Sequence, residues 1–524
     1  MTLSYNLIDE PWIPCARLDG SHVMLGLSSV VRDAHTLEGI HDPSPLVTLA
    51  LHRLLLSVIH RVVDGPQDVA HWKALWTAGR LDPSVFATYF DQWRHRFDLF
   101  DPVWPFFQVG GLATIDADGT PTEPSPVARM VVEMASGNNA TLFSHQRDDL
   151  SPPYPSDAVA RWLVTLQASG LGGGQGPRTN LFGTHPYASH APLAGQVSAM
   201  LVRPSLFETL ILNLVTYAGD SPFARSGEDL PVWERLVVRP PGKVAPDGYL
   251  DWLTFPARYV RLRPESDGVR FAWIAPGLAV QADDVSTFNP MAFYVASTDG
   301  LRPVALREER AVWRDSGALF AAGKGDPYGR RPRALDQAAQ RQIKSLLGTN
   351  PVLSIRCTGL ANDKAKPLLW REETMPTAIR LLNDDDAVAA VRDAIVAAET
   401  GNDALSKAFT RLAGVCLEAD GKKPDPADVG RVRTRMLAAA GYWSALDRHF
   451  LDFLRALGGD LDMALIAWKA QVLRSANAAY QRGANRVEGP LARRLHAQIC
   501  GEAVLYAGLQ RLKPANPLPE AARQ

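Results

Sequence analysis

The spacing of apolar residues becomes regular in the C-terminal part of the chain, after about residue 376. There, apolar residues return every three or four positions, which is the spacing of one face of a helix. The pattern predicts one helix over 427–457 and further helices over 460–483 and 488–512. A fourth helix is predicted to begin at Asn383, a suitable N-cap residue followed by acids in the first turn.

The first 375 residues carry shorter and more varied patterns. One β-hairpin is clear, because ARYVRLR and VRFAWI flank PESDG, in which Asp267 and Gly268 supply the turn. Helical spacing marks four segments, at roughly 45–64, 67–78, 157–169 and 334–346. The predicted fold class is therefore α+β, with a large mixed N-terminal domain over 1–375 followed by a C-terminal four-helix bundle over 376–524.

The composition is that of an ordinary globular protein, with 46% apolar and 21% charged residues. The most apolar early run is interrupted by four basic residues, so it predicts a buried helix and we expect no membrane partner: His52, Arg53, His60 and Arg61. The cysteines are far apart and form no CxxC pair, which argues against a cysteine zinc site and favours a reducing cytoplasm: Cys15, Cys357, Cys416 and Cys500. The net charge of −1 leaves nucleic-acid binding to local basic patches.

The chain begins with an unusual string, NLIDEPWIP, at residues 6–14. Pro11 and Pro14 rule out a helix, because proline lacks an N–H and has a fixed φ. Trp12 is a large apolar anchor between them. We expect a short extended segment that enters the fold with Trp12 buried.

A glycine-rich segment, SGLGGGQGPR, follows a predicted helix at residues 169–178. Glycines let the backbone approach a phosphate or a nucleic-acid groove closely, because no side chain intervenes. A nucleotide P-loop would need GK[ST] at its end and a strand before it, and neither is present. A flexible connector is the alternative interpretation.

Two further segments combine residue types that suit nucleic acid. TLFSHQRDD places Phe143 beside polar side chains, and an aromatic ring there could stack on a base. GLANDKAKPLLW, at residues 359–370, is a polar turn whose short side chains could be pushed between the strands of a duplex. An aromatic that packs its own loop and an ordinary exposed turn are the simpler alternatives.

Basic residues cluster in two places, around GKGDPYGRRPR and on the predicted bundle. Such clusters could follow a phosphate backbone, or they could be solvated surfaces. The candidate contacts with the DNA backbone are Lys324, Arg431, Arg433, Arg435, Arg493 and Arg494.

Signals of catalysis are weak. The chain has no HExxH, GxSxG or Walker A motif. NDDDA, at residues 383–387, could resemble a metal cluster, but acids there suit a helix start better. His185 and His190 are the one close histidine pair in a loop, and no nucleophile–base arrangement accompanies them. We therefore predict no catalytic residue, no metal and no cofactor.

NLIDEPWIP near the N-terminus resembles the start of the CasA family, the large subunit of the type I-E CRISPR Cascade complex. The likeness continues in order through WPFFQVGG, TLFSHQ, LGGGQG and NPMAFYV. A tryptophan-containing segment, LRPVALREERAVWRDSGALF, and the helical C-terminus follow. The resemblance therefore spans nearly the whole chain.

This resemblance implies a non-catalytic subunit that reads the protospacer-adjacent motif (PAM) in duplex DNA and helps open the duplex for guide-RNA pairing. Its implied partners are other Cascade subunits, the guide CRISPR RNA, double-stranded target DNA and a helicase-nuclease that does the cutting. The implied contacts fall into three groups. The PAM loop matches Gly170, Gly172, Gly173 and Gly174, the wedge that splits the duplex matches Asp363, Lys364 and Ala365, and the loop touching the guide matches Phe143, Ser144 and His145.

The chain departs from the family pattern in two places. Lys364 stands in the wedge where some members have glutamine. No lysine stands near Thr298, where a minor-groove lysine would align, so Arg302 or Lys324 could take its place. Two other interpretations remain, a metal-dependent phosphate-handling hydrolase that uses the glycine loop, and a helical scaffold without a nucleic-acid role.

Overall fold

A computed structural model describes residues 3–134, 151–174, 176–184, 187–217, 229–281, 289–321, 326–348, 352–418 and 422–513. The chain divides into two compact units. The first comprises Met1–Arg310, Ala322–Thr349 and Leu353–Thr374. The second comprises Ala311–Ala321, Asn350–Val352 and Met375–Gln524.

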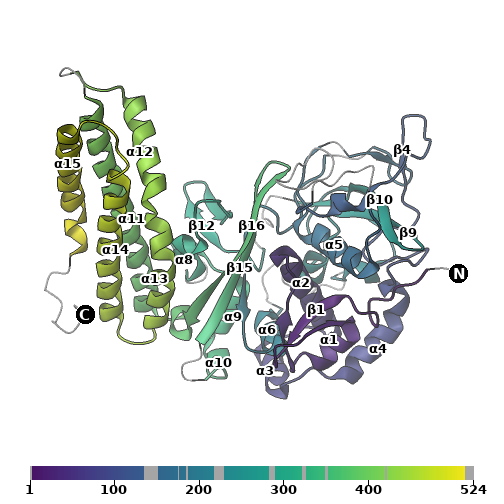
Figure 1. Ribbon diagram of the computed structural model, residues 1–524. Helices are drawn as coiled ribbons and strands as arrows, with labels where there is room; N and C mark the ends of the chain where they lie inside the picture. Colours follow the sequence, from purple (N-terminus) through teal and green to yellow (C-terminus); the bar gives the residue numbers. More distant parts are fainter. Residues whose placement is uncertain are drawn as a thin grey trace. The chain divides into compact units, whose positions relative to one another are not determined.

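The first part of the chain alternates short strands with helices, as Figure 1 shows. Its helices are α1 (Leu27–Asp33), α2 (Pro45–Val62), α3 (Val69–Ala78), α4 (Pro83–Trp93), α5 (Ser156–Ser169), α6 (Leu206–Asn213), α7 (Tyr249–Leu253), α9 (Arg333–Ala339) and α10 (Arg341–Lys344). Its strands are β1 (Ile13–Arg17), β2 (His22–Leu25), β3 (Leu37–Ile40), β4 (Thr114–Ile115), β5 (Ser125–Pro126), β6 (Arg178–Thr179), β7 (Val197–Val202), β8 (Gly242–Val244), β9 (Arg258–Glu265), β10 (Gly268–Pro276), β11 (Leu278–Val280), β12 (Tyr294–Ser297), β13 (Gly300–Pro303), β14 (Gly329–Arg330), β15 (Val352–Asp363) and β16 (Lys366–Ala378).

The N-terminal string enters the fold as expected. It leads into β1, the central strand of a sheet with order β2-β1-β3. Trp12 is fully buried, and its indole N–H donates a hydrogen bond to the carbonyl oxygen of Leu7 at 2.9 Å. The indole therefore satisfies its polar atom while filling the core.

Helix α2 is the buried helix that the sequence predicts. Among the helices that the structure describes, α2 alone is both long enough and apolar enough to span a membrane. However, 83% of that stretch is buried inside the protein. Three of its basic residues, His52, Arg53 and His60, are buried too, and they reach backbone oxygens. His52 Nδ1 lies 2.7 Å from the carbonyl oxygen of Thr48, and Arg53 Nε donates to the carbonyl oxygen of Leu253 at 2.8 Å.

Most predicted elements of the first part are confirmed, and one is wrong in its continuity. The hairpin forms β9 and β10, and the helices at 45–64, 67–78 and 157–169 are α2, α3 and α5. The helix expected over 334–346 is instead two short helices, α9 and α10. The chain breaks at Gln340, whose ψ of 133° is extended.

The C-terminal helices form the expected bundle, and the α+β fold class is confirmed. They are α11 (Asp385–Leu417), α12 (Pro426–Ala440), α13 (Tyr442–Ala456), α14 (Leu461–Ala484) and α15 (Leu491–Leu509). The segment 427–457, expected as one helix, is broken into α12 and α13. Gly441, with φ 58°, is in the left-handed region and interrupts the helix there. The two halves follow one another along one side of the bundle (Figure 1).

A segment from earlier in the chain completes the second unit. Residues Ala311–Ala321 belong to it, and they include α8 (Ser316–Leu319). The Trp313 ring stacks on Phe450 with centroids 4.2 Å apart, and its indole N–H donates to Asp447 at 2.8 Å. One aromatic side chain thus ties this segment to the bundle core.

Helix α11 begins one residue later than predicted. The Asp384 carboxylate, and not Asn383, caps it by accepting the Ala387 N–H at 3.1 Å. The pKa of the Asp384 carboxyl lies below its usual 3.8. Partial burial by itself would raise this pKa, but the hydrogen bond from Ala387 and the Arg380 guanidinium outweigh that effect. The cap therefore stabilises the helix above the ordinary pKa, and this stabilisation is lost as the pH falls through the lowered value.

Replacing Asp384 by alanine should weaken the first turn of α11 by about 1 kcal/mol near neutral pH, because the cap is lost. Hydrogen exchange of the amides at 385–388 should accelerate roughly fivefold. Asp384→Asn is the matched control, since its amide oxygen can still accept the Ala387 N–H, and it should retain most of the protection. A larger effect from Asn383→Ala would return the cap to Asn383.

Candidate nucleic-acid interface

The glycine loop, residues 170–174, follows directly from helix α5. The Gly170 N–H still donates to the carbonyl oxygen of Leu166, at 3.0 Å, and closes the last turn. Gly173 and Gly174 then take φ values of 142° and 73°, which favour glycine because a Cβ is strained there. The loop is thus a specific backbone conformation at the end of a helix.

The glycine loop lies against residues 188–191 through backbone hydrogen bonds. The Gly173 N–H donates to the carbonyl oxygen of Ala188 at 2.9 Å, and the Ala188 N–H donates to that of Gly174 at 3.3 Å. The Ala191 N–H donates to the carbonyl oxygen of Gly170 at 2.9 Å. These bonds fix the loop in place.

The three central glycines have different surroundings. A Cβ on Gly172 would lie 2.6 Å from the carbonyl oxygen of Ala188 and from the amide nitrogen of His190. A Cβ on Gly173 would lie 2.5 Å from the Cβ of Ala365. Among the described residues, a Cβ on Gly174 would meet no atom within 4 Å. The protein's own packing therefore requires glycine at 172 and 173, whereas Gly174 has no such neighbour among the described residues.

His190 holds the middle of the loop. Its Nδ1 accepts the Gly172 N–H at 3.0 Å, so the neutral ring must carry its proton on Nε2. Partial burial, helped by the positive charge of Arg258, lowers the pKa of His190 below its usual 6.5. The imidazole is therefore kept neutral, which is the form that can accept this hydrogen bond.

The side chain of Arg258 fixes the start of the glycine loop. Its Nη2 donates to the carbonyl oxygen of Leu171 at 2.7 Å, and burial lowers its pKa to about 10. Its backbone is clamped by the buried amide of Gln167, which accepts the Arg258 N–H at 2.9 Å and donates to its carbonyl oxygen at 2.8 Å. Sequence reasoning did not single out Arg258, because nothing local marks it.

The predicted wedge is the tip of a long antiparallel hairpin formed by β15 and β16. These strands lie in a sheet of order β16-β15-β7. Asp363 and Lys364 are exposed at the tip, and Lys364 has a positive φ of 52°. The side-chain amide of Asn362 donates to the carbonyl oxygen of Lys364 at 2.7 Å, which steadies the turn.

The structure brings the glycine loop and the hairpin tip together. Ala365 lies so close to Gly173 that no Cβ fits between them. The two segments are far apart in the sequence, and both were singled out as candidate DNA contacts. Together they form one continuous surface with Gly174, Asp363 and Lys364 exposed on it.

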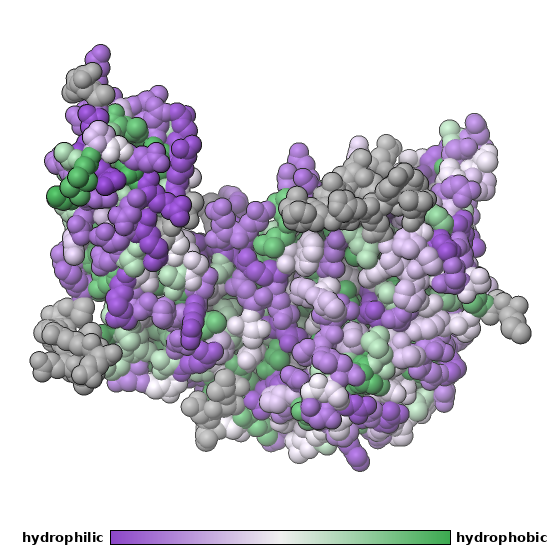
Figure 2. Space-filling model, in the orientation of Figure 1, coloured by the Kyte–Doolittle hydropathy of each residue, from purple (hydrophilic) through white to green (hydrophobic). Residues whose placement is uncertain are grey.

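The other candidate residues lie elsewhere or outside the described residues. On the bundle, Arg431 and Arg435 are exposed one turn apart on α12, while Arg433 is partly buried; Arg493 is exposed and Arg494 partly exposed on α15. Figure 2 shows a hydrophobic cluster over α15, where Leu491, Leu495 and Ile499 are exposed. Arg302 is exposed and pairs with Asp299. Phe143, Ser144, His145, His185 and Lys324 lie outside the residues that the structure describes.

The acidic run 383–387 forms the start of a helix. Asp384 is the cap of α11, and Asp385 and Asp386 occupy its first turn, where the helix dipole favours negative charge. Among the described residues, no group of three or more histidine, cysteine, aspartate or glutamate side chains could hold a metal ion.

Comparisons with known proteins agree on one family. Residues 6–479 match the family model described as CRISPR-associated protein Cse1. The CRISPR-associated protein CasA/Cse1 of Thermus thermophilus is 32% identical over 511 residues, 95% of this chain and 96% of that protein. A crystal structure of Thermus thermophilus CasA is similar with a TM-score of 0.79 and 28% identity, covering 97% of this chain and 100% of that one. A chain of a CRISPR RNA-guided surveillance complex shares the fold with a TM-score of 0.75 at 24% identity, covering 96% of this chain and 99% of that one.

Replacing His190 by alanine should release the middle of the glycine loop. Losing one hydrogen bond of about 0.5–1.5 kcal/mol should speed hydrogen exchange at Gly172 roughly three- to tenfold. His190→Asn is the matched control, because its Oδ1 can take the place of Nδ1. In the unaltered protein the bond should persist above pH 6.5 and fail as the pH falls through the lowered pKa of His190. Exchange at Gly172 that is as slow in His190→Ala as in the unaltered protein would show that His190 does not hold the loop.

Proposed function

The chain belongs to the CRISPR-associated Cse1 family, and we propose that it is the DNA-reading large subunit of a guide-RNA surveillance complex. The meeting of Gly173 with Ala365 carries this proposal, because it joins a backbone loop suited to a DNA groove to a rigid hairpin tip. The proposed partners are the other subunits of the complex, the guide RNA, the duplex target and a helicase-nuclease. Such a complex would act in the cytoplasm.

The glycine loop would read a short duplex feature through its backbone. Within the described residues, the Gly174 N–H has no hydrogen-bond acceptor, and a Cβ at this position would meet no neighbour within 4 Å. A backbone N–H can donate to the adenine N3 or thymine O2 of a minor groove, and a carbonyl oxygen can accept from the guanine 2-amino group. The minor groove distinguishes few base pairs, so this contact would tolerate several PAM sequences, and guide-RNA pairing would supply the remaining specificity.

The hairpin tip would open the duplex next to that contact. The strands behind the tip pair with one another, and β15 also pairs with β7 from Ser354 to Gly359, which supports the base of the hairpin. Asp363 and Lys364 are small or flexible enough to enter between DNA strands once a base step is unstacked. Because Ala365 rests on Gly173, the base pair read by the loop would fix which base pair the tip meets.

We propose a division of labour between residues 1–375, which read and open DNA, and residues 376–524, whose bundle steadies the DNA backbone. Arg431 and Arg435 support this role because they are exposed one turn apart on α12. Arg433 is less suitable, since it is partly buried. Arg493, Arg494 and Lys324 remain proposed backbone contacts, and Phe143, Ser144 and His145 remain proposed contacts with the guide and neighbouring subunits.

We propose that the chain does no covalent chemistry. The acids that could have formed a hydrolase site begin helix α11, where Asp384 caps the backbone and pairs with Arg380. Metal-dependent cleavage of DNA or RNA by the pure protein, lost on replacing Asp384 and Asp385, would favour the hydrolase alternative.

Gly174 offers the sharpest test of DNA reading. Gly174→Asn should fold normally, because asparagine tolerates positive φ and its Cβ meets no described residue within 4 Å. In the assembled complex, the new side chain should obstruct the groove and weaken binding to a PAM-containing duplex at least tenfold. Binding to an already single-stranded target should be unchanged, because pairing carries that recognition. Valine at Gly172 or Gly173 would be a poor test, since it would collide with the protein itself.

Gly119→Asn is the matched control for this experiment. Gly119 also has a positive φ, 85°, and open surroundings. It should leave binding to all three targets unchanged: duplex with PAM, duplex without PAM and single strand. Equal loss on duplex and single strand in the Gly174 variant would make the loop structural and contradict the proposal.

Lys364 tests the wedge. Lys364→Asn keeps a residue that accepts positive φ and shortens the side chain at the tip. We expect the affinity for a PAM-containing duplex to stay within about twofold of that of the unaltered complex. The rate of strand separation, measured by the permanganate reactivity of exposed thymines, should fall several-fold. A target with an unpaired bubble beside the PAM should restore the rate. Lys243→Asn, at an exposed lysine on β8, should change neither rate.

A further inference from the structure

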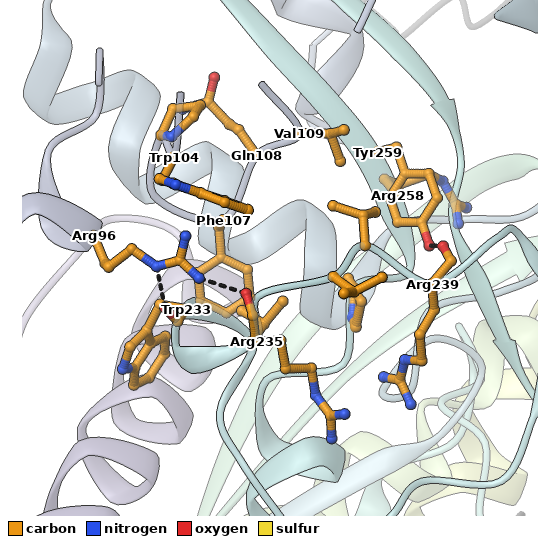
Figure 3. A pocket seen from close by; sticks show the side chains of 15 residues that line it. Arg96, Trp104, Phe107, Gln108, Val109, Trp233, Arg235, Arg239, Arg258 and Tyr259 are labelled. Carbon is orange, nitrogen blue, oxygen red and sulfur yellow. Dashed lines mark hydrogen bonds between the residues drawn. The ribbon is translucent and has the colours of Figure 1, made fainter. Parts of the chain in front are cut away.

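Two cavities in the first unit share Phe107 as a lining residue. The larger holds about 60 Å³, and Figure 3 shows it with Trp104 and Arg258 among the residues of its wall. The smaller holds about 10 Å³ and is lined by residues of α2, α5 and the end of α7. We call the smaller one the Arg53 cavity. The DNA contacts proposed above leave it unused.

Two polar side chains line the Arg53 cavity, and both are buried. Arg53 on α2 is 2% exposed, and Gln167 on α5 is 4% exposed. Among the residues that the structure describes, no carboxylate lines the cavity. The other lining residues are apolar: Ala50, Leu54, Phe107, Val164, Ala168, Leu253 and Phe255. Each polar group at this cavity must therefore find its partner in the backbone or in the cavity itself.

The protein's own groups engage only part of the Arg53 guanidinium. Its Nε donates to the carbonyl oxygen of Leu253 at 2.8 Å, and its Nη2 donates to that of Trp252. Within the described part of the chain, Nη1 has no hydrogen-bond partner, although it is shielded from solvent. Nη1 carries two N–H groups, so this end of the side chain requires an acceptor.

The Arg53 guanidinium keeps its positive charge in this buried position. Burial lowers the pKa of Arg53 to about 9, which still leaves the side chain protonated near neutral pH. The two carbonyl oxygens that it meets carry only partial charges. A buried cation is costly unless an anion compensates it. The charge of Arg53 therefore favours an anion in the cavity.

Gln167 offers the Arg53 cavity a second donor. Its Oε1 accepts the Arg258 N–H at 2.9 Å, and its Nε2 donates to the carbonyl oxygen of Arg258 at 2.8 Å. Nε2 also reaches the carbonyl oxygen of Phe107, but at 3.4 Å, which is long for a hydrogen bond. A ligand in the cavity would thus meet N–H groups from both polar side chains. Such a ligand must accept hydrogen bonds, as an anion does.

The volume of the Arg53 cavity limits the anion to a single atom. Its 10 Å³ is roughly the space that one water molecule needs. Chloride is only slightly larger than water, whereas phosphate, sulfate and carboxylates contain several heavy atoms. A water molecule would also fit by size, but its own hydrogens would face apolar side chains and it would leave the charge of Arg53 uncompensated.

We propose that the Arg53 cavity binds one chloride ion, held by Nη1 of Arg53 and Nε2 of Gln167. The ion would join α2 to α5 and compensate a charge that the fold otherwise buries alone. Gln167 also clamps the backbone of Arg258, so the chloride would lie next to the support of the glycine loop. The site belongs to the first unit and does not depend on DNA reading.

Bromide can locate the ion directly, because it replaces chloride and scatters X-rays anomalously. Crystals of the full chain grown with bromide as the sole halide should show an anomalous peak within hydrogen-bond reach of Arg53 Nη1. A water molecule at that position without anomalous signal, or bromide bound only at the protein surface, would overturn the proposal. This measurement needs no variant, so it decides the question even if a substitution at Arg53 prevents folding.

Thermal unfolding measures the same binding in solution. At a constant ionic strength of about 0.1 M, which keeps screening equal, the Tm should be roughly 1–2 °C higher in chloride than in gluconate, because a ligand that binds only the folded chain stabilises it. Arg53→Met removes the guanidinium and keeps a long apolar side chain, so this difference should vanish.

Arg32→Met is the matched control for the unfolding measurement. Arg32 is an exposed arginine on α1, so this variant should keep the difference between the two salts. A difference that persists in Arg53→Met, or that is lost equally in Arg32→Met, would overturn the chloride site. Equal Tm values in both salts for the unaltered protein would overturn it as well.

Discussion

The candidate DNA surface depends on the absence of a side chain at Gly172. Only glycine lets the loop lie against the carbonyl oxygen of Ala188 and the amide nitrogen of His190, which a Cβ would approach to 2.6 Å. That close approach permits the hydrogen bonds that fix the loop, and the fixed loop places Gly173 against the hairpin tip. A surface built from two distant segments therefore rests on one missing methyl group.

The polar groups that fix the glycine loop are themselves fixed by their buried surroundings and by hydrogen bonds. His190 accepts from Gly172 only while neutral, and its surroundings lower its pKa. Arg258 is buried, and Gln167 clamps its backbone on both sides. Because buried polar groups are costly when unpaired, each of these bonds stabilises the arrangement more than its own strength suggests. A rigid backbone loses little freedom on meeting DNA, which favours recognition through a few backbone atoms.

Arg258 also connects two features that the sequence leaves separate. It forms part of the wall of a cavity of about 60 Å³, lined also by Trp104 and Tyr259, and it donates to the carbonyl oxygen of Leu171 at the start of the glycine loop. WPFFQVGG marks a resemblance in the sequence without indicating a role. In the structure it forms part of the wall of that cavity, and its strained Phe107 is held by Trp233, more than a hundred residues later.

The sequence alone determined the features that depend on local patterns. Apolar periodicity located α2, α5, α14 and α15, a cap residue and acids located the start of α11 to within one residue, and the turn residues located the β9–β10 hairpin. Two prolines and a tryptophan predicted the buried entry strand, and a chain of short motifs carried the family resemblance. These succeed because helix and strand periodicity, turn preference and the burial of large apolar residues are local effects.

The tertiary structure decided everything that depends on distant neighbours. The glycines of 172–174 look alike in the sequence, yet packing requires two of them and leaves Gly174 open. The cap of α11 moved from Asn383 to Asp384, and Trp313 joined the bundle, because the chain's path set which partners each side chain could reach. Gly173 meets Ala365 across a long stretch of sequence. Close approach is a property of pairs of segments, and no local pattern in either segment encodes its partner.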